Sequence, residues 1–192
     1  MRKTAIVMLV LVTALVFGLP QYCSAQGVSF GLKGGINMAK LTGSDAGTNS
    51  MKTGFVAGAF TTVDMVFLNI QPEILFSQKG ATYEVFGLSI DENHNYLEIP
   101  VLFKFPLGKI VVPSIYVGPS LGMLMSADVE GFDIKDGLKS TDLGLVFGMD
   151  VKTPVKLILD ARYTMGLTSI DDSGIYDVKN SAISLMVGYA IF

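Results

Sequence analysis

Apolar and polar residues alternate in segments of about ten residues along most of this chain. In segment 95–105, Leu97 to Phe105 has an apolar residue at every second position, while Glu98 and Lys104 occupy the other register. Successive side chains of a β-strand point to opposite faces, so one face of this segment is hydrocarbon and the other carries charge. Seven further segments show a period of two, although in 53–63 the outward set stays ambiguous. The eight predicted strands are 28–41, 53–63, 66–77, 95–105, 114–126, 141–151, 157–168 and 182–192.

The links between these segments alternate between short and long. The short links are 64–65, 107–113 and 152–154. The long, polar links are 42–52, 79–94, 127–140 and 169–180. Bacterial outer-membrane barrels place short turns on the periplasmic side and longer loops outside the cell. The pattern therefore predicts an all-β fold: an eight-stranded antiparallel up-and-down transmembrane β-barrel with both barrel termini in the periplasm.

The composition agrees with a membrane barrel. Hydrophobic residues make up 50% of the chain and the mean hydropathy is +0.51, yet no apolar run after Leu19 is long enough for a spanning helix. A helix needs roughly 20 apolar residues to cross a bilayer. Because backbone groups in hydrocarbon must be paired internally, only helices and closed barrels span membranes. Excluding helices leaves the barrel.

The first 25 residues have the features of a cleavable signal peptide. Arg2 and Lys3 form a basic start, Ala5 to Leu19 is apolar, and Cys23 to Ala25 has small residues where a signal peptidase cuts. We expect residues 1–25 to be the signal peptide and residues 26–192 to form the outer-membrane barrel domain. A membrane anchor would need a longer apolar run, and a lipid-modified Cys23 would need different residues before it.

The overall charge is acidic. The chain has 14 basic and 17 acidic residues, a net charge of −3, and loss of the signal peptide would remove Arg2 and Lys3. Nucleic-acid-binding domains are typically basic. The balance argues against nucleic acid as a partner.

The size of the side chains predicts which register faces inward. Phe103, Phe147 and Tyr163 are too bulky to converge on the narrow interior of an eight-stranded barrel. We therefore expect them to face lipid and the smaller and charged residues to face the lumen. Unpaired buried charges are costly, so the inward charges should form a structural network of salt bridges and hydrogen bonds that fills the lumen. Its predicted members are Lys33, Glu73, Glu98, Lys104, Asp142, Asp150, Asp160 and Arg162.

Three prolines fall inside predicted strands. Pro72, Pro100 and Pro119 each remove a ladder donor, and a closed barrel has no free edge on which to place them. Local β-bulges would accommodate them. We therefore expect bulges at these positions.

Four stretches carry a family likeness: Phe30 to Asn37, Gln71 to Gly80, Tyr96 to Lys104 and Val187 to Tyr189. They resemble the PorT-like family of outer-membrane β-barrel proteins, and the likeness covers essentially the whole mature chain. The resemblance implies a barrel in the outer membrane, and a few family members are linked to secretion machinery. It brings no catalytic residues.

Candidate chemistry is sparse, and we predict no catalytic, cofactor-binding or metal site. Asp160 and Arg162 have the charges of a general base and an anion clamp, but neighbouring inward charges of opposite sign are more often structural. His94 is the sole histidine and lies in the predicted 79–94 loop, where we expect a solvated position. The chain also lacks the Gly-x-Ser-x-Gly elbow of serine hydrolases.

The sequence thus predicts a structural or interaction protein of the outer membrane rather than an enzyme. Lipid is its first expected partner. Apolar residues in 79–94 and 127–140 suggest either protein contacts through these loops or strands that extend above the membrane. The alternatives are a component of a secretion or assembly system, a narrow small-solute channel, and a soluble lipocalin-like carrier.

Overall fold

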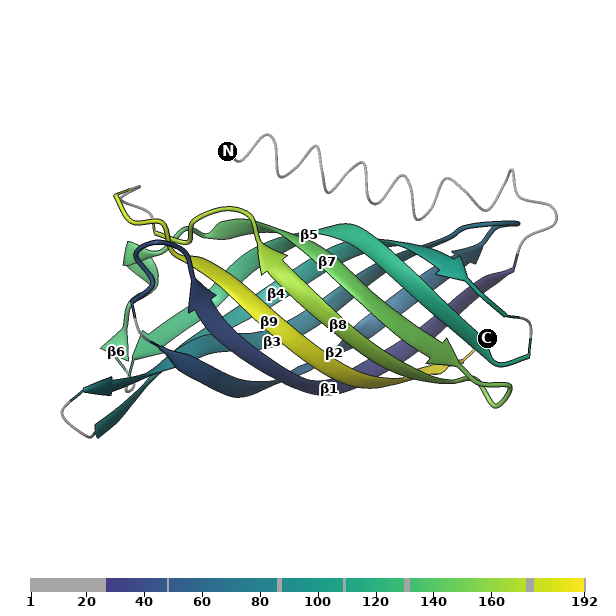
Figure 1. Cartoon of the computed structure of the whole chain (residues 1–192), viewed down its shortest axis with the longest axis horizontal. Helices are drawn as coiled ribbons and strands as arrows, with labels where there is room; N and C mark the ends of the chain where they lie inside the picture. Colours follow the sequence, from purple (N-terminus) through teal and green to yellow (C-terminus); the bar gives the residue numbers. More distant parts are fainter. Residues whose placement is uncertain are drawn as a thin grey trace.

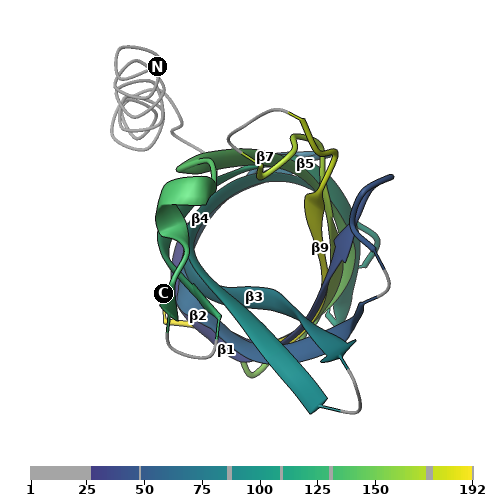
Figure 2. The ribbon, with the colours of Figure 1, turned by 90° about the vertical axis from the view of Figure 1, so that its left-hand side faces the viewer.

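The chain forms a closed barrel of eight long antiparallel strands (Figures 1 and 2). The computed structural model describes residues 27–47, 49–85, 88–108, 110–129, 132–171 and 175–191, so the predicted signal peptide lies outside the described residues. A two-residue strand and a short 3-10 helix, β6 and η1, follow β5. The elements are β1 Val28–Thr42, β2 Ser50–Asp64, β3 Asn69–Val85, β4 Leu88–Pro106, β5 Val112–Val129, β6 Phe132–Asp133, η1 Lys135–Gly137, β7 Thr141–Lys152, β8 Leu157–Gly166 and β9 Lys179–Ala190.

Each long strand pairs with its neighbours in the chain, and the first strand closes the barrel on the last. β1 pairs with both β2 and β9, and β4 pairs with both β3 and β5. All these pairings are antiparallel. The predicted eight-stranded up-and-down barrel is confirmed. Within the described ranges, no helix is long and apolar enough to cross a membrane.

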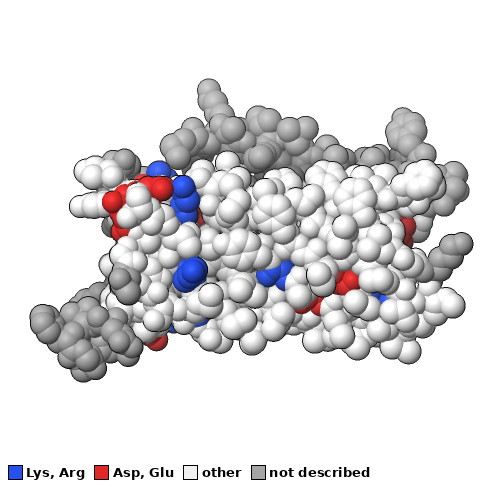
Figure 3. Space-filling view, in the orientation of Figure 1, with Lys and Arg blue, Asp and Glu red and all other residues white. Residues whose placement is uncertain are grey.

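The two registers face as the side-chain sizes predicted. Phe103, Phe147 and Tyr163 lie on the outer surface, whereas Glu98 and Asp160 are buried in the lumen. In β2 the ambiguity is resolved: Phe55 faces outward and stacks on Phe76 of β3, with ring centroids 5.4 Å apart. Uncharged residues cover most of the wall seen in Figure 3; the largest group of charged residues lies at its left-hand end, and smaller groups show along the wall and at the right-hand end. A soluble carrier with an apolar cavity is therefore excluded.

Long and short connections separate to the two ends of the barrel (Figure 1). The turn end carries the links 65–68, 107–111 and 153–156 together with Gly27 and Ile191. The opposite end, here called the loop end, carries the remaining links. The boundaries of the predicted loop 79–94 were wrong, whereas the alternative of strands that extend above the membrane is confirmed there. β3 and β4 continue outward as a hairpin that pairs Thr82 with Asp91.

The prolines are accommodated without bulges of their own, contrary to the prediction. Pro72 pairs with Val101 and Pro100 pairs with Ser120, with no register shift at either pair. Pro119 precedes Ser120, so the three missing donors fall close together on β3, β4 and β5. The register shifts lie elsewhere, between Met51 and Val56 in the β2–β3 pairing and between Asn95 and Tyr96 in the β4–β5 pairing.

Candidate functional site

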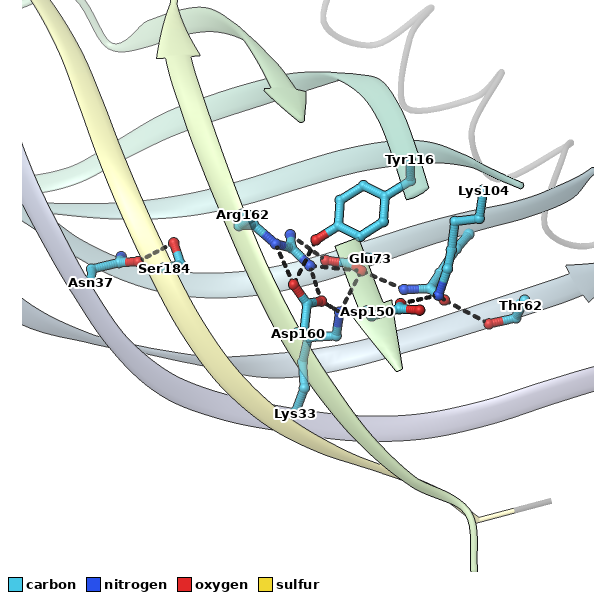
Figure 4. A network of polar contacts seen from close by, with 11 residues as sticks. Lys33, Asn37, Thr62, Glu73, Lys104, Tyr116, Asp150, Asp160, Arg162 and Ser184 are labelled. Atoms are coloured by element: carbon cyan, nitrogen blue, oxygen red, sulfur yellow. Dashed lines mark hydrogen bonds and ion pairs between the residues drawn. The ribbon is translucent and has the colours of Figure 1, made fainter. Parts of the chain in front are cut away.

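Four charged side chains meet inside the turn-end half of the lumen (Figure 4). Lys33 Nζ of β1 lies 2.7 Å from Glu73 Oε1 of β3 and 2.7 Å from Asp160 Oδ2 of β8. Arg162 of β8 reaches the same two acids, with Nη1 2.9 Å from Glu73 Oε2 and Nη2 2.7 Å from Asp160 Oδ2. The Tyr116 hydroxyl of β5 donates to Asp160 Oδ1 at 2.5 Å. Side chains from four strands are thereby tied together across the barrel.

A second ion pair joins this group through one amide. Gln71 Nε2 donates to Glu73 Oε1 at 2.6 Å, and Gln71 Oε1 accepts from Lys104 Nζ at 2.9 Å. Lys104 also pairs with Asp150. We call these residues the turn-side network: Lys33, Gln71, Glu73, Lys104, Tyr116, Asp150, Asp160 and Arg162. Its three acids and three bases balance, as burial of ionised groups in low dielectric requires.

Aromatic faces support the cations of this network. Lys33 Nζ lies 5.2 Å from the ring centroid of Phe60, and Arg162 Cζ lies 5.6 Å from that of Tyr116. These distances are within the range for cation–π attraction. Phe60 and Tyr116 therefore fill space and stabilise charge at once.

The middle of the lumen is partly apolar, which the expectation of a small and polar interior omitted. Val56, Leu75 and Met186 form one buried cluster. Beside it, Asn37 Nδ2 donates to Ser77 Oγ at 2.6 Å, and Ser184 Oγ donates to Asn37 Oδ1 at 2.5 Å. Large side chains enter where glycines on neighbouring strands leave room, as Gly148 does for Tyr116.

Towards the loop end lies a second polar group with less complete pairing. Lys79 of β3 forms an ion pair with Glu98 of β4, and both line a pocket with Asp142 of β7 and Asn180 of β9. Asn180 Nδ2 donates to the Tyr96 hydroxyl at 3.1 Å. We call these residues, together with His94 and Glu92, the loop-side network.

Unpaired buried atoms distinguish the two networks. In the described part of the chain, four buried side-chain atoms have no hydrogen-bond partner: His94 Nδ1, Asn95 Oδ1, Asp150 Oδ1 and Asn180 Oδ1. Three of them belong to residues at the loop-end half of the barrel. Leaving a buried polar atom unpaired lowers stability, so this half is the less optimised of the two.

An apolar cluster covers the loop-end mouth. Leu41, Ala46, Ala81 and Ile170 are buried together, and Tyr83, Leu138 and Val178 pack against them. Two backbone bonds hold this loop cap in place, because Lys139 N donates to the Ile170 carbonyl oxygen and Ile170 N donates to that of Val178, both at 2.8 Å. Tyr83 and Leu138 lie in the two segments for which the sequence suggested protein contacts. Both side chains pack within the barrel's own loop end instead.

Outside the strands, Asp45 ties the first loop to the last. Asp177 N donates to Asp45 Oδ2 at 2.8 Å and the Ser44 hydroxyl donates to the same atom at 2.9 Å. These bonds favour the ionised carboxylate, the Asp177 amide most, and lower the pKa of Asp45. Asp45 therefore stays charged at neutral pH.

The structure places all eight predicted lumen residues inside the barrel, in two groups. Six belong to the turn-side network, whereas Glu98 and Asp142 line the loop-side pocket. Glu73 pairs with Lys33 and Arg162, whereas Glu98 pairs with Lys79.

Sequence reasoning missed Lys79 and misplaced His94, for the same reason. Lys79 is in phase with Glu73 and Ser77, but it was assigned to a loop where strand parity was not applied. His94 is fully buried, with Nε2 2.7 Å from Glu92 Oε1, so the expected solvated position was wrong. The even spacing of His94, Tyr96 and Glu98 was the signal that would have found it.

Fold and lumen together define a bacterial outer-membrane barrel with eight strands. Residues 23–172 match the family described as outer membrane protein beta-barrel domain, and the chain belongs to this family. No curated protein matched the sequence.

Solved outer-membrane barrels have a similar fold. Neisserial surface protein A is 19% identical, with 85% of this chain and 98% of that one covered and a TM-score of 0.56. Ail, the attachment invasion locus protein of Yersinia pestis, is 18% identical, with coverage of 87% and 100% and a TM-score of 0.51. A major outer membrane protein of Thermus thermophilus is 15% identical, with coverage of 86% and 100% and a TM-score of 0.53. At these identities the likeness shows the fold alone.

Proposed function

We propose that this protein is a closed outer-membrane barrel with a structural or interaction role, carried out at its loop end. The observation that carries the proposal is the turn-side network, in which charged side chains from several strands meet and neutralise one another in the lumen. A lumen filled in this way stiffens the barrel and obstructs solute flow.

The proposed orientation puts the turn end and both barrel termini in the periplasm. Barrels of this class have short periplasmic turns and longer extracellular loops. Gly27 and Ile191 lie at the end with the short turns: Gly27 accepts a bond from Asp64 N, and Ile191 N donates to Phe30. Protease added to intact cells should cut within 167–178 and leave the 65–68 and 107–111 turns intact; the opposite pattern would reverse the orientation.

Measurement of single-channel conductance distinguishes the proposed closed barrel from a narrow channel. The protein purified from outer membranes and inserted into planar bilayers should show no single-channel steps, because the turn-side network obstructs the lumen. A known porin inserted from the same detergent serves as the control for insertion. Reproducible single-channel steps from the wild-type protein would contradict the closed barrel and support the narrow channel.

We propose a contact surface for protein partners at the loop end, in the hairpin of 79–94 and the segment 127–140. Ile175 and Tyr176 are exposed beside them. The hairpin can be shortened without removing Tyr83 from the loop cap: Tyr83 pairs with Ile90, so a two-residue Asn-Gly turn can replace 84–89.

Cross-linking on intact cells tests this surface. Partners of the wild type should be lost in the shortened variant, whereas a variant with Ile175→Ser, outside the hairpin, should keep the contacts that the hairpin makes. Identical cross-links in wild type and shortened variant would remove the hairpin from the proposal.

The proposal includes a non-catalytic role. His94, the sole histidine, lies fully buried against Glu92 and Tyr96. The second candidate is a component of a secretion or assembly system, which the PorT-like motifs favour. Deleting the gene should then reduce the amount of secreted protein, while a purely structural barrel would leave secretion unchanged.

A further inference from the structure

The three turns at the turn end expose large apolar side chains. Phe67 in the β2–β3 turn is 85% exposed, Ile110 in the β4–β5 turn is 77% exposed, and Val155 in the β7–β8 turn is 71% exposed. Val66 and Leu107 add to this surface. We call it the apolar rim: Val66, Phe67, Leu107, Ile110, Val111 and Val155.

Turns that face water are built from glycine, proline, asparagine, aspartate and serine. Contiguous exposed apolar surface instead marks contact with a membrane or a protein. Because the rim residues come from three separate turns, one irregular turn does not explain them. The exposed apolar surface is therefore a property of this end of the barrel as a whole.

The rim continues the lipid-facing wall without a polar break. On β4 and β5 the outward residues Phe105 and Ile115 are exposed next to Leu107 and Ile110 of the rim. At the end of β9, Tyr189 and Ile191 are exposed as well. The other end of the wall differs, because exposed polar groups mark its limit. There Ser126, Ser140 and Thr141 are exposed.

The charges at the turn end fit the headgroups of phospholipids. Lys156 is exposed in the β7–β8 turn and its Nζ donates to the Ile191 carbonyl oxygen at 3.1 Å, at the level of the rim. Lys152 and the acidic Asp64 are both partly exposed nearby, so the bases at this end outnumber the acid. Lysine side chains at a membrane interface keep their stems in apolar surroundings and their ammonium groups near phosphate.

We infer that the apolar rim is inserted into the phospholipid leaflet at the turn end, so that the three turns lie at the boundary between headgroups and acyl chains. The lipid contact of this barrel then includes its turn end as well as its wall. The turn end lies within that leaflet instead of projecting beyond it. The inference rests on the proposed placement of the barrel in the outer membrane. A periplasmic protein that covers the rim is the competing occupant.

The absence of tryptophan from the chain makes the test direct. Phe67→Trp, Ile110→Trp and Val155→Trp each place one fluorophore on the rim. Phe147→Trp places one on the wall, and Tyr176→Trp places one on the exposed loop end. Each variant is purified from outer membranes, reconstituted into vesicles of phosphatidylethanolamine and phosphatidylglycerol, and checked for a folded, heat-modifiable band.

The three rim variants should emit at shorter wavelength than Tyr176→Trp. Phospholipids brominated close to the acyl carbonyl should quench them strongly, whereas aqueous acrylamide should quench them weakly. Phe147→Trp should be quenched best by lipids brominated deeper in the chain. These outcomes together support the inserted rim.

Two results would overturn the inference. Rim variants that emit and quench like Tyr176→Trp would place the turns in water. Rim variants that are shielded in native outer membranes but water-exposed in pure lipid vesicles would show that a protein covers them. If Phe147→Trp is also water-exposed, the membrane placement itself fails, which distinguishes that failure from failure of the rim alone.

Discussion

The two halves of the lumen use the same kinds of residue with different completeness. In the turn-side network, Glu73 and Asp160 each accept bonds from both Lys33 and Arg162, and acids and bases balance. In the loop-side network, Lys79 pairs with Glu98, and both His94 and Asn180 keep an unpaired buried atom, whereas the turn-side network has one such atom, on Asp150. We conclude that the turn-side half of the lumen contributes most to the stability of the barrel. The loop-side half, which lies close to the proposed contact surface, depends less on its individual side chains.

The largest expected effect is at Arg162. Arg162→Met leaves Lys33 as the one described cation that pairs with Glu73 and Asp160. Removing one partner of a buried ion pair costs about 3–5 kcal/mol. The free energy of unfolding, measured by urea titration in lipid vesicles, should fall by this amount. Lys139→Met, at a partly exposed position outside the network, is the control and should change it by less than about 0.5 kcal/mol.

A compensating change sharpens this result. Adding Glu73→Gln to Arg162→Met restores the charge balance, so the double variant should recover part of the lost stability. If Arg162→Met alone costs less than about 1 kcal/mol, the network does not anchor the barrel, since ordinary exposed ion pairs contribute that little.

Two glycines on β7, one in each half of the lumen, allow the packing of the two halves to be compared. Gly148 lies in the turn-side half, where an added Cβ would overlap the Tyr116 hydroxyl and ring, whereas the nearest atom to a Cβ at Gly144 is 3.3 Å away. Gly148→Ala should therefore cost about 2 kcal/mol by overpacking, and Gly144→Ala should be nearly neutral. Both are read from the midpoint of urea unfolding. Equal midpoints would mean that the two halves are packed alike.

Lys79 tests the loop-side ion pair. Lys79→Met removes the partner of Glu98, whose side chain is 10% exposed and so remains within reach of water. We expect a loss of about 1.5 kcal/mol, near the lower end for hydrogen bonds to charged groups. Lys40→Met, on the same end of the barrel but outside this pair, serves as the matched control. A loss as large as that of Arg162→Met would erase the difference between the two halves.

The smallest effect is expected at His94. His94→Phe removes the bond to Glu92 but also removes the unpaired Nδ1, so the two contributions oppose each other and the net change should stay within about 1 kcal/mol. His94→Ala should cost more, because it also removes packing against Tyr96. If His94→Phe costs more than about 1 kcal/mol, the bond to Glu92 outweighs the unpaired Nδ1.

Prediction from the sequence succeeded where local geometry is sufficient. The outward placement of Phe103, Phe147 and Tyr163 follows from strand alternation and from the narrow interior of a small barrel. It failed where an element boundary was misjudged: Lys79 and His94 were assigned to a loop, although β3 and β4 continue past both. The predicted proline bulges failed because Pro72, Pro100 and Pro119 fall together in neighbouring strands, and strand pairing is not visible in the sequence.

The sequence by itself determined the class of fold and, for every predicted strand except 53–63, which face points outward, because a period of two is a property of the extended backbone alone. The tertiary structure decided which inward charges meet. Lys33 pairs with Glu73 on β3 and with Asp160 on β8 only because the registers of several strand pairs bring these residues to one level of the barrel. Strand register is set by the barrel as a whole, so no single segment of the chain contains it.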